Sequence, residues 1–122
     1  MPDPYSALSD FVTGKLPWTE LQSIGFTFEV RANEMSVTSS DLSVTFEASV
    51  QDVANGILRH SSVDEASKRW AQALLGVTAI DLSALEDDPD GEVLLNAVWD
   101  MAIGKELSAE ALRAAKRMSD RR

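Results

Sequence analysis

The stretch GEVLLNAVWDMAIG, from Gly91 to Gly104, constrains the fold more than any other part of this chain. Between Val93 and Ile103 only Asn96 and Asp100 are polar, and on a helix the apolar residues go most of the way round. A helix that is apolar on nearly every side has to be buried on nearly every side. Since it is too short to span a membrane, we expect it at the centre of a protein core, with Trp99 shut away from water.

The ends of this predicted helix are marked by residues with known end preferences. Pro89, Asp90 and Glu92 suit a first turn, because carboxylates favour the positive end of the helix dipole. Gly104 suits the left-handed position just past a last turn. The helix should therefore begin near Pro89 and end before Gly104.

Length and residue usage predict a single cytoplasmic domain over residues 1–122. The chain has no cysteine, which excludes disulfides and cysteine-based zinc sites and fits a reducing compartment. The first residues, MPDPYSALSDF, lack the basic and apolar regions of a secretory signal. We therefore expect a cytoplasmic protein that does not enter a membrane.

The formal net charge of −9 restricts the classes of partner. Binding to nucleic acid or to an anionic membrane surface needs positive charge, so neither is expected. The charge favours solubility, and it would speed encounter with a basic protein. Solubility alone remains the simpler interpretation of the acidity.

The period of the apolar residues divides the chain into segments and predicts an α+β fold. Residues 1–25 favour a short helical pair that leads into the fold. Residues 26–48 alternate apolar and polar side chains, which is typical of a three-stranded antiparallel meander. Residues 49–118 favour a helical bundle packed against that meander, and residues 119–122 a frayed tail.

Capping signals place the helices of the second half. Ser49 with Asp52 and Ser62 with Glu65 have the spacing of capping boxes, and Ser108 is expected to cap the last helix. Gly56 should weaken its helix by roughly 1 kcal/mol relative to alanine. In the helix after Ser62, Trp70 is expected to point inward, and Asp64, Lys68 and Gln72 outward.

The most distinctive candidate site is an acidic segment between two helices. Its carboxylates are Asp81, Glu86, Asp87, Asp88, Asp90 and Glu92. Part of it matches a calcium-binding loop, but the position that needs a bidentate glutamate is Ala97, so no calcium site is expected. Three interpretations stay open: a solvated ridge, contact with the basic end of the same chain, or a docking surface for a basic protein. The basic end comprises Arg113, Lys116, Arg117, Arg121 and Arg122.

Signatures of catalysis are scarce, and no cofactor or metal is expected. His60 is the only histidine, and we expect the helix dipole to favour a partial positive charge on it. The chain has no phosphate-binding or dinucleotide-binding glycine motif and no G-x-S-x-G elbow. Glu29 and Glu47, with Arg31 nearby, could face each other on the polar side of the sheet, although a solvated surface is the simpler interpretation.

These observations favour a non-enzymatic protein–protein interaction domain that docks a basic partner through residues 81–92. Size and charge are shared with bacterial immunity proteins and antitoxins, so an inhibitor of that kind is one form of the hypothesis. One alternative is a small enzyme or ligand-binding protein with a pocket between sheet and helices, lined by Glu29, Glu47 or His60. Another is a homo-oligomer, such as a homodimer, in which a second copy covers open strand edges or a spare apolar helix face. The three tryptophans, Trp18, Trp70 and Trp99, are expected in or at the edge of the core, and an exposed one beside the acidic segment would indicate a binding hot spot.

Overall fold

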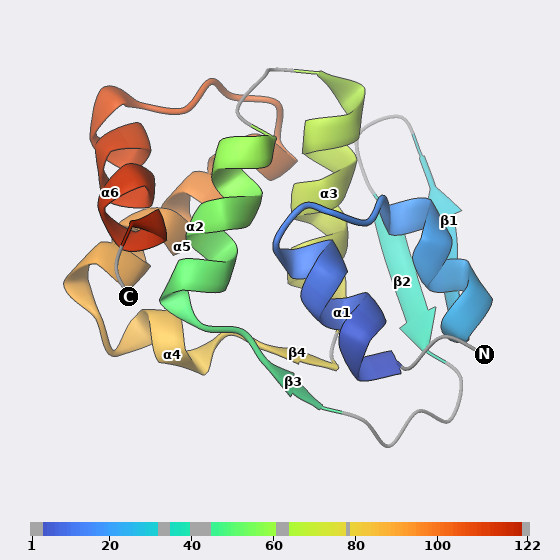
Figure 1. The fold of residues 1–122 in the computed structure, drawn as a ribbon. Coiled ribbons are helices and arrows are strands. Elements are labelled where there is room, and N and C mark those ends of the chain that lie inside the picture. Colours follow the sequence, from blue (N-terminus) through green and yellow to red (C-terminus); the bar gives the residue numbers. More distant parts are fainter. Residues whose placement is uncertain (1–3, 32–34, 40–44, 61–63, 78, 121–122) are drawn as a thin grey trace.

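The computed structural model describes residues 4–31, 35–39, 45–60, 64–77 and 79–120, and the structural statements below concern these residues. The elements run in the order α1 (Pro4–Val12), the 3-10 helix η1 (Trp18–Ile24), β1 (Phe26–Val30), β2 (Met35–Ser39), β3 (Phe46–Glu47), α2 (Val50–Arg59), α3 (Glu65–Gly76), β4 (Ile80–Asp81), α4 (Ser83–Glu86), α5 (Pro89–Ala102) and α6 (Ala109–Ser119). The predicted α+β class is confirmed (Figure 1).

The predicted three-stranded meander is wrong. β1 and β2 form an antiparallel hairpin in which Phe26 lies opposite Ser39 and Val30 opposite Met35. β3 pairs instead with β4, in parallel, with Phe46 opposite Ile80. Alternation of apolar and polar residues shows that a segment is half-buried, but it does not specify the partner strand. The predicted third strand also included Leu42 and Val44, which lie outside the described residues.

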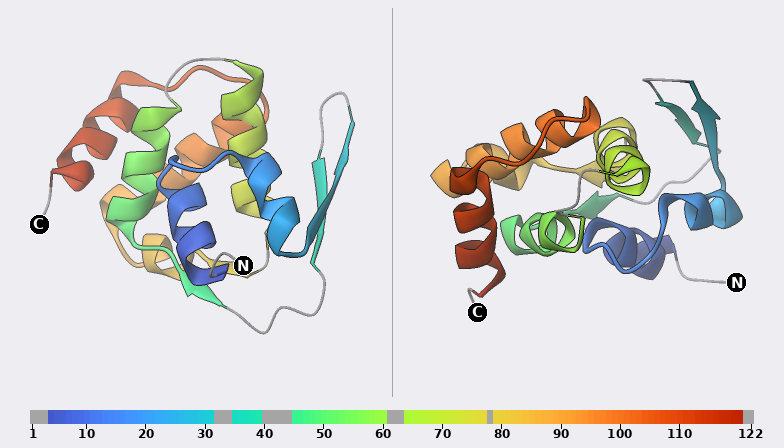
Figure 2. Two further views of the ribbon diagram at one scale, coloured as in Figure 1. Left: turned by 45° about the vertical axis from the view of Figure 1, so that its right-hand side comes forward. Right: turned by 90° about the horizontal axis from the view of Figure 1, so that it is seen from above.

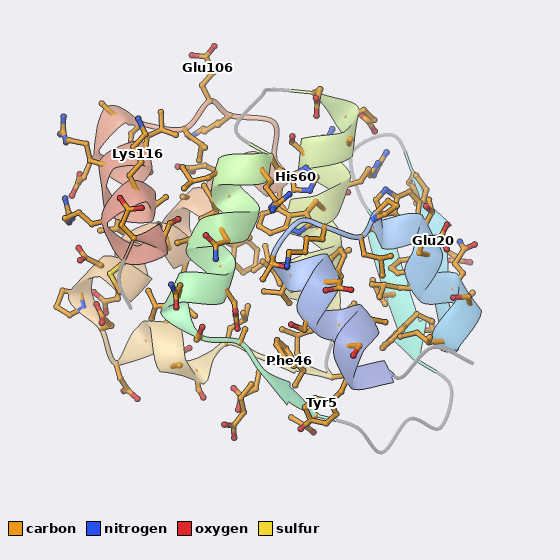
Figure 3. The ribbon with its side chains drawn as sticks, viewed as in Figure 1. Tyr5, Glu20, Phe46, His60, Glu106 and Lys116 are labelled. Carbon is orange, nitrogen blue, oxygen red and sulfur yellow. The ribbon has the colours of Figure 1, made fainter. Side chains whose placement is uncertain are left out.

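β3 is held away from the hairpin by contacts with the first helix. The Tyr5 hydroxyl of α1 donates a hydrogen bond of 2.6 Å to the backbone oxygen of Thr45. Its ring meets the Phe46 ring edge-on, with centroids 6.0 Å apart (Figure 3). These contacts place β3 beside α1 and β4, so the second sheet is separate from the hairpin.

The helices lie between the hairpin on one side of the molecule and α6 on the other (Figure 2). Trp70 of α3 is buried among them, and its indole Nε1 donates a hydrogen bond of 2.8 Å to the backbone oxygen of Phe11. Since a buried indole N–H needs an acceptor, this bond satisfies it and joins α3 to α1.

Gly56 permits close packing around Trp70. A methyl group built at this position would overlap the backbone oxygen of Val12 and the ring of Trp70. Alanine at this position should therefore not stabilise the protein as it would an isolated helix, because its methyl group would push α2 away from α1. The glycine is a requirement of the packing and not only a weakness of the helix.

The ends of α5 agree with the sequence prediction. Asp88 is the N-cap, and its side chain accepts hydrogen bonds from the backbone N–H groups of Asp90 and Gly91 at 2.8 and 3.3 Å. Pro89 follows as the first helical residue. Gly104 has a φ of 82°, the left-handed conformation expected just past a helix end.

The prediction that α5 is buried on nearly all sides, with Trp99 in the core, is wrong. Leu94 and Val98 are fully buried, whereas 57% of Trp99 and 64% of Ile103 are exposed. α5 packs against α2, α3, α4 and α6, and these neighbours cover only one side of it. An apolar sequence shows that a helix needs cover, but it cannot show whether the chain has enough elements to supply it.

The other caps agree with the sequence prediction in two cases of three. Ser49 and Asp52 form the predicted capping box, and the Ser108 side chain accepts from the N–H of Ala111 at 3.1 Å. The N-cap of α3 is Asp64, whose side chain accepts from Ser67, and the predicted cap Ser62 lies outside the described residues. α6 extends to Ser119, one residue past the predicted end.

We expect Trp70→Ala to lower the free energy of unfolding by roughly 3–5 kcal/mol, because it empties a packed site and leaves the Phe11 carbonyl without its donor. Trp99→Ala should change it by less than about 1 kcal/mol, as exposed substitutions usually do. Urea denaturation of both variants checks the assignment. A larger loss for Trp99→Ala than for Trp70→Ala would contradict the core described above.

Candidate functional site

Three of the six acidic residues singled out in the sequence have structural partners. The Asp81 carboxylate accepts a hydrogen bond of 2.9 Å from the backbone N–H of Ser83, and bonds from Ser83 hold the pKa of Asp81 below its ordinary value. Asp88 caps α5. Asp90 pairs with Arg117, with 2.9 Å between Oδ1 and Nη2. These three carboxylates shape the segment between β4 and α5.

The other three, Glu86, Asp87 and Glu92, are exposed. Within the described part of the chain their side chains form no hydrogen bond or ion pair with the protein. Glu86 ends α4, Asp87 follows it, and Glu92 lies in the first turn of α5. The structure therefore brings three uncommitted negative charges to the connection between α4 and α5.

Contact between the acidic segment and the basic end of the chain is limited. Arg117 is the residue of α6 that reaches the segment, and both partners of its ion pair with Asp90 are partly exposed. Lys116 lies on the same helix (Figure 3), and Arg121 and Arg122 lie outside the described residues. One surface ion pair is worth roughly 0–1 kcal/mol, so it does not neutralise the segment.

A second feature, which sequence reasoning missed, is an exposed apolar surface on α5. Trp99 and Ile103 lie one helical turn apart and form one wall of a hollow of about 300 Å³ between α3, α5 and β2. We call this hollow the Trp99 groove, and its lining is Met35, Gln72, Leu75, Gly76, Trp99, Ala102 and Ile103. None of these side chains carries a charge.

A buried polar network lies beneath the groove. Arg69, only 6% exposed, donates to Gln72 Oε1 at 2.8 Å and to the backbone oxygen of Arg31 at 2.7 Å. Gln72 Nε2 donates in turn to the backbone oxygen of Ala102 at 2.9 Å. The prediction that Gln72 points outward is therefore wrong. The network joins the end of β1, α3 and the end of α5, and it fixes the walls of the groove.

His60 is the C-cap of α2, and its ring lies between α2 and α3 (Figure 3). The ring stacks on Trp70 with centroids 5.0 Å apart, and Nε2 is buried without a hydrogen-bond partner among the described residues. Burial lowers the pKa of His60, and the nearby Asp64 carboxylate opposes this only in part. This direction is opposite to the partial positive charge that we expected from the helix end.

The structure does not assemble the acid–base groups considered in the sequence. Glu29 lies on β1 and Glu47 on β3, in different sheets. A second hollow, of about 170 Å³ beside α1 and η1, is lined by Ser6, Ala7, Asp10, Leu16, Glu20 and Ser23. Neither hollow is lined by Glu29, Glu47 or His60. Across the described ranges, no three metal-ligating side chains form a group that could hold an ion.

No known protein family matches the chain, and no curated protein or solved structure shows significant similarity to it. Within the described residues, no helix has the length and apolar character needed to cross a membrane. The acidic segment and the Trp99 groove are therefore the features from which a function can be inferred.

We expect Arg69→Ala to lower the free energy of unfolding by about 1–3 kcal/mol, because it removes the donor for the buried Gln72 Oε1 and for the part-buried backbone oxygen of Arg31. Glu65→Ala is the matched control. Its carboxylate bonds the same guanidinium at 2.8 Å but is itself exposed, so its loss should cost at most about 1 kcal/mol. Equal losses in urea denaturation would contradict the buried role of Arg69.

Stability should fall as the pH drops from about 7 to about 5.5, the range in which histidine titrates. The unfolded chain takes up a proton near the ordinary pKa of 6.5, whereas the folded chain resists it because its His60 pKa is lowered. His60→Phe keeps a ring against Trp70 and removes the titrating group, so its free energy of unfolding should stay nearly constant across that range. An equal decline in both proteins would exclude His60 as the source.

Proposed function

We propose that the protein is a non-enzymatic interaction domain that binds a basic partner protein through residues 81–92. The supporting observation is that the six carboxylates fall into a structural group and an exposed group. Asp81, Asp88 and Asp90 hold the segment in shape, while Glu86, Asp87 and Glu92 are exposed and uncommitted. A rigid segment that presents free like charges suits recognition of a surface of opposite charge.

The energetics of the whole chain support the same proposal. With a net charge of −9, these exposed carboxylates repel one another, and a cationic partner relieves that repulsion. Attraction of this kind mainly raises the rate of encounter, and it is screened over about 8 Å at physiological ionic strength. Association with the basic partner should therefore weaken steeply as salt is added.

A basic enzyme that acts on nucleic acid is a partner with suitable chemistry. Its substrate site has to attract phosphate groups, so it carries clustered Lys and Arg side chains. The acidic segment can occupy such a site and exclude the nucleic acid. The proposed role is then that of an inhibitor of the immunity or antitoxin type.

The experiment compares two double variants with the same change in net charge. Glu86→Lys with Asp87→Lys reverses the free carboxylates of the segment, whereas Glu20→Lys with Glu29→Lys reverses exposed charges on η1 and β1, far from α4 (Figure 1). The basic protein captured by the wild type from the source cells is titrated with each variant at several salt concentrations. We expect the first variant to bind about tenfold more weakly and the second to bind like the wild type to within about twofold.

Equal weakening by both variants would mean that only the overall charge matters, and the docking surface would be rejected. Binding that is insensitive to salt would reject the electrostatic basis. The structural carboxylates Asp88 and Asp90 are left unchanged in this design, so that the segment keeps its shape.

A further inference from the structure

One face of the core residue Trp70 is covered by a ring that can take up a proton. Trp70 is 1% exposed, whereas His60, whose ring stacks on it with 5.0 Å between the centroids and 21° between the planes, is partly exposed. The imidazole therefore lies between the indole and water. We propose that His60 is a pH-sensitive cover: its neutral ring closes the core over Trp70, and its protonated ring turns out into solvent and leaves that face of Trp70 open.

The position of His60 at the end of α2 allows its ring to move without unfolding a helix. His60 is the C-cap, and its backbone N–H donates to the carbonyl oxygens of Gly56 and Ile57 at 3.1 and 3.2 Å. These bonds do not involve the side chain, so they persist when the ring rotates about its side-chain bonds. The indole is held independently, through the bond from its Nε1 to the Phe11 oxygen. Opening therefore changes one contact of the core and leaves the helices in place.

A charged imidazole is poorly accommodated in the stack. Both ring nitrogens of a charged imidazole carry a proton, and Nε2 is buried without a hydrogen-bond partner among the described residues, so its proton would find no acceptor. Burial accordingly lowers the pKa of His60. Cation–π attraction to the indole face acts in the opposite direction. We expect desolvation to prevail, because water solvates both nitrogens once the ring has turned out.

The charged groups around the ring give the stacked, protonated form little support. From α3, the Asp64 carboxylate raises the pKa of His60, but it is exposed and already accepts the N–H of Ser67 at 2.8 Å. From α2, exposed Arg59 runs its alkyl stem along Gly14 of the connection after α1. Lys15 in that connection is also exposed, and neither cation contributes to the shift in the pKa of His60.

The direction of the pH dependence follows from the two positions of the ring. In the open position the imidazole titrates near its ordinary pKa of 6.5, whereas in the closed position its pKa is lower. As the pH falls below 6.5, protons bind preferentially to the open form and shift the population toward it. Between the two pKa values, each unit of pH changes the ratio of open to closed molecules about tenfold. At higher pH the ring is neutral in both positions, and the cover stays closed.

NMR of the wild-type protein is the first test, because its only histidine gives unambiguous ring signals. At about pH 7.5 we expect nuclear Overhauser contacts between the rings of His60 and Trp70. As the pH is lowered, the His60 signals should titrate with a pKa below 6.5, and these contacts should fade over the same range while the far-UV circular dichroism stays unchanged. Contacts that persist after the ring is fully protonated, or a pKa at or above 6.5, overturn the proposal.

The accessibility of Trp70 gives a second, independent readout. Trp18→Phe with Trp99→Phe leaves Trp70 as the sole tryptophan, and its quenching by acrylamide should rise at least about twofold between about pH 7.5 and about pH 5. Adding His60→Phe to the same background is the matched control. The phenyl ring still covers Trp70 but cannot be charged, so quenching should stay constant. Equal rises in both proteins, or a rise that accompanies loss of far-UV circular dichroism, would indicate unfolding and overturn the cover.

The cover is separate from the proposed function, because His60 and Trp70 lie outside residues 81–92. His60→Phe should therefore bind the basic partner like the wild type at about pH 7.5, where the His60 ring is neutral and closed. Glu86→Lys with Asp87→Lys should in turn leave the titration of His60 and its contacts with Trp70 unchanged. The two proposals can thus fail independently of each other.

Discussion

The packing of Trp70 is the contact on which the rest of the structure depends. Its ring is buried between α1, α2 and α3, its N–H is bonded to the Phe11 carbonyl, and His60 stacks on its face. Gly56 leaves room for this arrangement by removing the one side chain that would collide with it. The hydrogen bond from Trp70 to Phe11 thereby attaches α1 to the helical half of the molecule.

The surface of the molecule separates into regions of different chemistry. The connection between α4 and α5 carries uncompensated carboxylates, while the far end of α5 carries Trp99 and Ile103 beside an uncharged groove. Because α5 joins the two regions as one rigid helix, a contact at either end has a fixed orientation relative to the other.

Local features were predictable from the sequence because they depend on neighbouring residues. Pro89 and Gly104 mark α5, and the caps at Ser49 and Ser108 need only the next few N–H groups. The acidic segment could also be identified, although not which of its carboxylates are committed, since the partner of Asp90 lies in α6.

Features that depend on distant contacts were not predictable. Trp70 and Trp99 both lie in apolar stretches, and only the arrangement of the helices decides that the first is enclosed and the second exposed. Arg69 and Gln72 resemble ordinary surface residues of a helix, because their acceptors come from β1 and α5. The partner of β3 is a strand of two residues, which is too short to show alternation.

That short parallel pair has a consequence for how the chain reaches its final form. β3 and β4 contribute two residues each and are separated in sequence by the whole of α2 and α3. Closing so long a segment costs entropy that a few backbone hydrogen bonds cannot offset on their own. We therefore expect the pair to form late, after the helices between its strands have docked, and not to nucleate folding.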